Sequence, residues 1–199
     1  MALPPHFIQK LHQNQTEGLF RDLQLLCDGQ IIDVHKIIIC SYSPVLFAAL
    51  SGPYQEQDEG VYEIKDSSYP IVLGMVEFMY KGTYKVSNHD STAVHGGHPR
   101  VLFHAGMVAL ADKYLIPSLR ELALSKFKKC VNSETDFRPL LQSVSGVYAI
   151  QGDGNAELRR ILVSHFEDWF ASYIGRDGME DLLRDISKTK TLNLQSILQ

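Results

Sequence analysis

The sequence predicts an α+β fold in which a small β-sheet is flanked by a cluster of helices. A strand, turn and second strand are compressed into residues 22–34. Most of the remaining chain has apolar residues at helical spacing, interrupted by Gly and Pro breaks. With 199 residues and 45% hydrophobic content, the chain is long enough to bury a core.

The sheet begins with a hairpin. Residues 23–27 (LQLLC) place apolar side chains at alternate positions, as a half-buried strand does. Asp28-Gly29 predicts a tight turn, and the β-branched run in residues 31–34 predicts the returning strand. A third strand is predicted at residues 61–64.

Helices account for most of the other elements. His35-Lys36 opens a short helix, and Ser43 before Pro44 predicts an N-cap with proline in the first turn. Asp66-Ser67-Ser68 is a capping cluster for a helix whose core positions are Val72, Met75, Val76 and Met79. The helices expected from apolar spacing and breaks are residues 5–15, 44–50, 70–80, 102–114, 117–131, 137–149 and one from Asn155 onward.

The chain divides into three predicted regions: residues 1–21 with a first helix, a core at 22–131 and a helical extension at 132–199. A short lone helix is marginal in water, so the first helix must dock on something. The helix after Asn155 also needs a partner surface because its apolar face is wide. That face consists of Leu158, Ile161, Leu162, His165, Phe166, Trp169 and Phe170.

The order of residues resembles the BTB/POZ domain family, whose core reads D-x-x-L, G, V-H-K and then a helix ending in S-x-x-F. The ADKY form of one downstream segment is most like fungal BTB proteins and the BTB domains of Cullin-3 adaptors. The resemblance implies a BTB/POZ fold and a non-catalytic protein–protein interaction module. The matching segments are Asp22 to Leu26, Gly29, Val34 to Lys36, Ser43 to Phe47, YEIKD at 62–66, VEFMYKGTY at 76–84 and ALADKYLIPSLRELALSKF at 109–127.

A homodimer is the first partnership that the resemblance implies. In the family, the N-terminal helix packs across a two-fold axis against a second subunit. This assigns Phe7, Ile8, Leu11 and Leu19 to the dimer interface. The alternative is that the helix folds back on its own domain. The helical extension resembles the 3-box or the start of a BACK domain.

Cullin-3 is the second implied partner. Cullin-binding members carry a hydrophobic residue followed two positions later by Glu, a fixed distance before the third strand, and Tyr54-Gln55-Glu56 stands in that register. The family also implies Tyr114 as a further contact. The expected function is a substrate adaptor for a Cullin-3-type ubiquitin ligase, with an unknown substrate protein. The alternative is a solvated acidic loop, with Tyr54 packed on its own domain and Tyr114 at a boundary between two helices.

Asp22 and Lys36 match the charged groove in which BTB transcription factors bind corepressor peptides. This supports an alternative function, a dimeric corepressor-recruiting or scaffolding module without a ubiquitin-ligase role. The two residues can instead form an ion pair that fixes the hairpin against the helix, and this structural interpretation is favoured because charges near the interior must be paired. His35 is expected to be a hydrogen-bonded core histidine.

The sequence favours neither a metal site nor catalysis. His89, His95, His98 and His104 lie in or near a polar, glycine-containing segment, where incidental surface histidines are the better account. There is no G-x-S-x-G elbow, P-loop or G-x-G-x-x-G motif. The chain is therefore not expected to be an enzyme or to bind a cofactor.

Composition sets the remaining expectations. A net charge of −4 with dispersed Lys and Arg argues against nucleic-acid binding. The chain lacks both a membrane-length apolar run and a signal-peptide layout, so neither membrane association nor secretion is expected. Cys27, Cys40 and Cys130 lack metal spacing and fit reduced thiols. These features predict a protein of the cytoplasm and/or nucleus.

Overall fold

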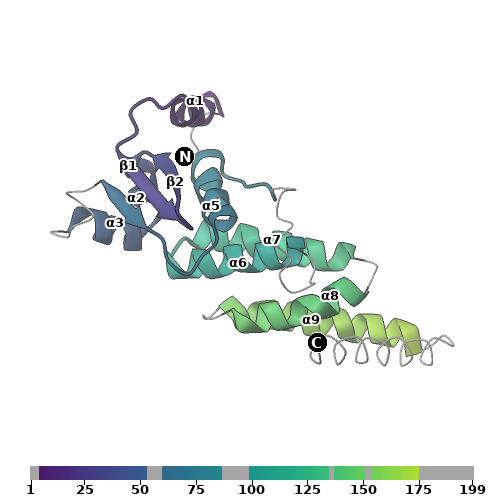
Figure 1. The fold of residues 1–199 in the computed structure, drawn as a ribbon. Coiled ribbons are helices and arrows are strands. Elements are labelled where there is room, and N and C mark those ends of the chain that lie inside the picture. Colours follow the sequence, from purple (N-terminus) through teal and green to yellow (C-terminus); the bar gives the residue numbers. More distant parts are fainter. Residues whose placement is uncertain (1–4, 53–59, 87–98, 135–136, 151–153, 175–199) are drawn as a thin grey trace. The chain divides into compact units, whose positions relative to one another are not determined.

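The fold is a three-stranded sheet with helices packed around it and a helical extension, in a computed structural model that describes residues 5–52, 60–86, 99–134, 137–150 and 154–174 (Figure 1). This confirms the α+β class. The helices after residue 132 are also confirmed for the described part of the extension.

The predicted hairpin forms from β1 (Leu23–Cys27) and β2 (Gln30–Val34), which pair antiparallel with Cys27 opposite Gln30. Asp28 and Gly29 have φ values of 49° and 70°, as a two-residue type I′ turn requires. The third strand, β3 (Val61–Glu63), pairs parallel with β1 and gives the order β2-β1-β3. Alternate residues of β1 are buried, so one face of the sheet lines the core.

The helices follow the expected order, with ends shifted by a few residues. Ser43 caps its helix as predicted, because its side chain accepts the N–H of Leu46. The helices are α1 (Pro5–Thr16), α2 (Lys36–Tyr42), α3 (Pro44–Ser51), α5 (Tyr69–Lys81), α6 (Pro99–Lys113), α7 (Pro117–Ser133), α8 (Phe137–Ala149) and α9 (Gly154–Ile174).

Helix α5 is central to the first part of the fold. It contacts α1, α2 and β2 as well as α6, so it joins the sheet to the following helices (Figure 1). The four predicted core positions of this helix are all buried. The helix ends at Gly82 in the left-handed conformation, with φ of 71°. Burial of these apolar side chains stabilises the packing of α5 against the hairpin.

The capping cluster predicted before α5 is wrong in its detail. Ser68 stands at the N-cap, but its side chain makes no capping hydrogen bond. The Asp28 carboxylate instead accepts the N–H of Tyr69 at 2.8 Å, across 41 residues of sequence. The hairpin turn therefore caps the central helix and fixes its position against the sheet.

We expect Asp28→Ala to lower the free energy of unfolding by about 1–2 kcal/mol, because it removes this cap and places alanine at positive φ. Urea unfolding monitored by circular dichroism measures the loss. Ser68→Ala is the matched control and is expected to cost less than about 0.5 kcal/mol. Equal costs for the two variants would show that Asp28 does not cap α5.

Helix α8 packs on α6, and the first turn of α9 is tied to α7 by an ion-pair network. Arg120 bonds the Asp112 carboxylate at 2.8 Å and the Glu157 carboxylate at 3.0 Å. By its contacts the chain divides into two compact units, Met1–Arg159 and Arg160–Gln199. The predicted boundaries at residues 21 and 131 stay predictions.

In the second unit, the apolar face predicted for α9 is visible in the burial pattern. Leu162 is buried, and the rings of Trp169 and Phe170 meet edge to face with centroids 5.5 Å apart. None of the helices in the described ranges combines the length and the apolar character that spanning a membrane requires.

Candidate protein-binding surfaces

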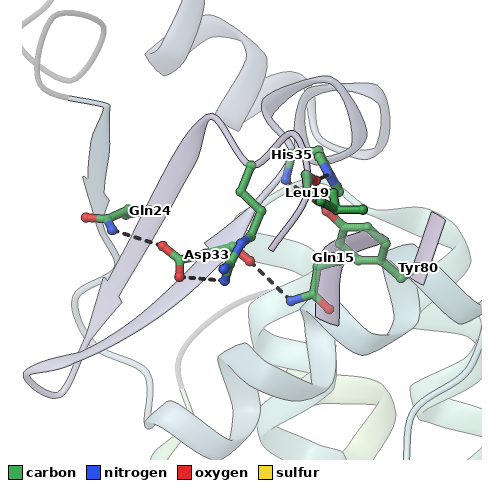
Figure 2. A network of polar contacts seen from close by, with 7 residues as sticks. Gln15, Leu19, Gln24, Asp33, His35 and Tyr80 are labelled. Carbon is green, nitrogen blue, oxygen red and sulfur yellow. Dashed lines mark hydrogen bonds and ion pairs between the residues drawn. The ribbon is translucent and has the colours of Figure 1, made fainter. Parts of the chain in front are cut away.

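A buried polar network at His35 holds the N-terminal segment against the domain (Figure 2). The Nε2 atom of His35 lies 2.8 Å from the carbonyl oxygen of Leu19, which can only accept, so Nε2 carries the proton. Nδ1 then accepts from the Tyr80 hydroxyl at 2.7 Å, and the same hydroxyl oxygen accepts the backbone N–H of His35 at 2.8 Å. The prediction that His35 is a hydrogen-bonded core histidine is confirmed.

The Tyr80 hydroxyl must keep its proton to donate to His35. Burial raises the pKa of Tyr80 to about 12, and the Asp22 carboxylate acts in the same direction, whereas the N–H donated by His35 acts against it. The hydroxyl therefore remains a donor throughout the neutral range. The centroids of the two rings are 5.7 Å apart.

Asp33 is the second anchor of the N-terminal segment (Figure 2). Its carboxylate accepts from Arg21 at 2.7 Å and from Gln24 at 2.9 Å, while its backbone carbonyl accepts from Gln15 of α1 at 3.1 Å. The end of α1 is thus hydrogen-bonded to strand β2 of the same chain. In the single chain, α1 also packs on α5. These contacts within one chain correspond to the alternative given for this helix, in which it folds back on its own domain, and a dimer stays a prediction.

Helix α1 ends in a Schellman motif that turns the chain outward. Gly18 has φ of 78°, its N–H donates to Gln15 and the N–H of Leu19 donates to Asn14. Phe20 follows with φ of 61°, a conformation that costs a residue with a side chain about 1–2 kcal/mol. The backbone therefore holds an aromatic residue in a strained position.

This turn exposes an apolar pair, Leu19 at 44% and Phe20 at 83% exposure. Leu11 is half-buried, and the side chains of Phe7 and Ile8 lie outside the described residues.

Ile37, 70% exposed, is the second residue of α2. We call Leu19, Phe20 and Ile37 the N-terminal surface. The sequence did not identify Phe20 as a surface residue, because it belongs to no periodic pattern. The only local indication of a turn is Gly18, two residues earlier.

Asp22 and Lys36 meet, but not as an ion pair between side chains. The Asp22 carboxylate accepts the backbone N–H of Lys36 at 2.6 Å, at the first residue of α2. This bond caps the helix and brings its start beside the segment that carries Phe20. The two residues therefore link the hairpin to the helix, as the structural interpretation expected. The link is made by the backbone N–H of Lys36, whereas an ion pair with its ammonium was expected.

A second apolar surface lies where α3 meets the end of α6. The Ser43 hydroxyl donates to the carbonyl of Tyr114 at 2.6 Å, so the start of α3 is bonded to the α6–α7 turn. On these elements, Phe47 is 56% exposed and Leu115 is 57% exposed with φ of 52°. We call Phe47 and Leu115 the α3 corner.

Tyr114 does not offer its ring to a partner at this corner. The side chain is only 2% exposed, and burial raises its pKa, with Tyr62 acting in the same direction. Its neighbour Leu115 takes the exposed position instead. The sequence alone did not reveal that Tyr114 is buried and that Leu115, which has a positive φ, is the exposed residue of the two.

The segment that carries Tyr54 and Glu56 lies outside the described residues, so their predicted cullin contacts stay predictions. It follows α3, which ends at Ser51. The chain returns at β3, so residues 53–59 connect α3 to the sheet. Phe47 stands one helical turn before the end of α3.

The described histidines and cysteines do not assemble a metal or nucleophile site. His89, His95 and His98 lie outside the described residues, whereas His104 is buried on α6 and bonded to the Tyr84 hydroxyl. Within the described ranges, no three His, Cys, Asp or Glu side chains gather closely enough to hold a metal ion. The three cysteines are free, and burial raises the pKa of each thiol, opposite to what a nucleophile needs.

Comparison with known proteins matches this arrangement to one family. A family model for the BTB/POZ domain matches residues 11–130. Protein maternal effect lethal 26 of Caenorhabditis elegans is 26% identical over 186 residues, which cover 86% of this chain and 42% of that protein. BTB and MATH domain-containing protein 42 of the same species is 32% identical over 106 residues, 53% of this chain and 23% of that protein. The chain spans less than half the length of both relatives.

Among solved structures, the BTB domain of human gigaxonin is similar to this chain. It is 21% identical, with a TM-score of 0.46, and the match covers 63% of this chain and 95% of that chain.

Proposed function

Because the chain belongs to the BTB/POZ domain family, we propose that it is a non-catalytic protein–protein interaction module that forms a homodimer and serves as a substrate adaptor for a Cullin-3-type ubiquitin ligase. BTB domains generally mediate self-association and the binding of other proteins. The observation that carries the proposal is the presence of two separate exposed apolar surfaces on a well-buried core.

The N-terminal surface supports self-association. Phe20 is held outward by a strained backbone, and an exposed aromatic ring of this kind is the side chain that most often dominates an interface. Two-fold symmetric interfaces use the same patch on both subunits. Leu11 and Leu19, with Phe7 and Ile8, remain the predicted dimer contacts, and we add Phe20 and Ile37.

The α3 corner supports the cullin role. Phe47 and Leu115 are exposed, and Phe47 lies on α3, the helix that precedes the Tyr54-Gln55-Glu56 segment in the chain. We propose that the exposed side chains of this corner contribute apolar area to cullin binding, in addition to the contacts predicted for Tyr54 and Glu56. Leu115 takes the place that the sequence had assigned to Tyr114.

The alternative is a dimer that recruits a corepressor or scaffolds other proteins without a ligase. That role requires Asp22 and Lys36 to be available to a peptide. One oxygen of the Asp22 carboxylate accepts the backbone N–H of Lys36, which gives Asp22 a structural role at the start of α2. The substrate protein, the likeness to fungal members and the cytoplasmic or nuclear compartment stay predictions.

The adaptor function is tested by titrating the full chain with the N-terminal region of Cullin-3 in a calorimeter. We expect saturable binding, and we expect Tyr54→Ala/Glu56→Ala to weaken it by about 30-fold or more, since a hot spot contributes about 2 kcal/mol. Asp58→Ala, in the same segment but outside the motif, is the matched control and should bind as the wild type does. Absence of binding, or equal effects of the double variant and the control, would reject the adaptor role.

A further inference from the structure

A pocket of about 440 Å³ lies among the end of α5, α6 and α7, away from the surfaces described above. Its volume falls in the range of small-ligand sites. The described residues that line it include four cationic side chains and no carboxylate. The lining residues are Tyr84, Lys85, Val86, Arg100, His104, Lys126, Lys129, Cys130 and Ser133.

This concentration of positive charge contrasts with the whole chain, whose net charge is −4. Lys85 comes from the segment after α5 and Arg100 from the first turn of α6, and Lys126 and Lys129 come from one face of α7. Like charges that line one pocket repel one another, and an anion bound between them relieves the repulsion. The pocket is therefore electrostatically complementary to an anionic group.

Lys126 is held in place at the floor of the pocket. Its ammonium donates to the backbone carbonyl of Tyr84 and to Thr83 Oγ1, and it lies 4.0 Å from the centroid of the Tyr84 ring. An ammonium has three N–H donors, so these two bonds leave one for a ligand. Burial lowers the pKa of Lys126, which means that the charged form is incompletely compensated.

The pKa of His104 is affected by the same positive charges. Its ring is 5% exposed and its Nδ1 lies 2.9 Å from the Tyr84 hydroxyl. Burial, followed by the charges of Lys126 and Arg100, lowers the pKa of His104 to about 4. The imidazole is neutral at physiological pH, so it adds polarity without charge.

Two carboxylates outside the lining act near the pocket. Besides burial, Glu134 raises the pKa of the lining residue Cys130, and Glu77 is bonded to other groups. Glu77 accepts from the Lys81 ammonium at 2.9 Å and from the backbone N–H of Lys85 at 2.9 Å. The Glu77 carboxylate acts to raise the pKa of Lys126, but burial outweighs it and the pKa is lowered overall. The charge of Lys126 is therefore only partly offset by Glu77.

We propose that this pocket binds a phosphate-bearing ligand, either a small phosphate compound or a phosphorylated side chain of a peptide. A phosphate group presents oxygens in several directions and carries close to two negative charges, which suits a pocket lined by cations from α6, α7 and the segment after α5. Arg100 supplies a forked donor and the three lysines supply point charges. None of the lining residues is one that we assign to dimer formation or to cullin binding.

The test is calorimetric titration of the full chain at about 0.15 M ionic strength, where long-range attraction is screened. The probes are sodium tripolyphosphate, a capped tetrapeptide with a central phosphoserine, its unphosphorylated counterpart, and citrate. In parallel, NMR titration follows the His104 ring, whose pKa should move upward when the anion binds.

The informative variants are Arg100→Glu and Lys129→Glu, because both side chains are exposed and their loss leaves the Tyr84 contact with Lys126 intact. Each should weaken binding at least about tenfold, as expected for one charge-assisted bond. Lys128→Glu is the matched control, since Lys128 is an exposed neighbour on α7 that does not line the pocket. It should change the affinity less than about twofold.

Binding of tripolyphosphate identifies a small phosphate ligand, and binding of the phosphopeptide alone identifies a phosphorylated partner. Either result supports the proposal when the variants behave as stated. The proposal is overturned if neither probe saturates below about 5 mM. Equal effects of Lys128→Glu and Lys129→Glu, or citrate binding as tightly as the phosphate probes, would overturn it as well.

Discussion

Replacing Tyr80 with phenylalanine is expected to lower the free energy of unfolding by about 3 kcal/mol, because the change orphans two buried groups at once. The backbone N–H of His35 loses its acceptor and Nδ1 of His35 loses its donor. Neither group reaches water easily, since His35 is 7% and Tyr80 3% exposed. The ring is retained, so the loss reflects hydrogen bonding rather than packing.

Urea unfolding gives this difference directly, and a thermal scan should show a melting temperature lower by about 6–12 °C for a chain of this length. Tyr69→Phe is the matched control. Tyr69 stands at the start of the same helix with a partly exposed side chain, so its variant should stay within about 0.5 kcal/mol of wild type. A Tyr80→Phe protein as stable as the control would contradict the His35 network.

Ser43→Ala should cost about 3 kcal/mol, because one hydroxyl serves two partners in a fully buried position. The variant removes the N-cap of α3, where the hydroxyl accepts the N–H of Leu46 at 3.1 Å. It also leaves the carbonyl of Tyr114 without its donor. The connection that positions Phe47 relative to Leu115 is then broken, so cullin binding should weaken along with stability.

Ser41→Ala is the matched control, which tests whether the loss of stability is specific to Ser43. Its hydroxyl bonds Ile37 within the exposed part of α2, so its loss should cost less than about 0.5 kcal/mol. Both values come from urea unfolding. Similar costs for the two serine variants would contradict the double role of Ser43.

The elements that could be predicted from sequence are those determined by neighbouring residues. Asp28-Gly29 specifies its turn because both residues tolerate positive φ, and Ser43-Pro44 specifies a helix start because cap and first turn are adjacent. Periodicity likewise predicted the buried face of α5. In each case the determining interaction spans only a few positions of the chain.

The features that the sequence did not predict depend on contacts between distant segments. The cap of α5 comes from Asp28 rather than from residues 66–68, and Asp22 bonds a backbone N–H rather than the Lys36 ammonium. Opposite charges in a sequence do not show whether a carboxylate bonds the side chain or the backbone of the other residue.

Single backbone angles account for the differences at the two candidate surfaces. Phe20 and Leu115 each combine a positive φ with an exposed side chain, while Tyr114 is buried. Neither residue is a glycine or asparagine, the types that usually reveal such a conformation. The basic pocket likewise gathers Lys85, Arg100, Lys126 and Lys129 from separate segments, so no local pattern marks it.

The central claim is that this chain works by binding other proteins, beginning with a second copy of itself. Sedimentation equilibrium at about 20 µM, where interfaces of standard size are occupied, measures this most directly. The account predicts twice the monomer mass of 22.4 kDa for the wild type. It predicts the monomer mass for Leu19→Asp/Phe20→Asp, whereas Leu141→Asp, at an exposed position on α8, should remain dimeric. A wild-type protein that sediments at 22.4 kDa would contradict the claim.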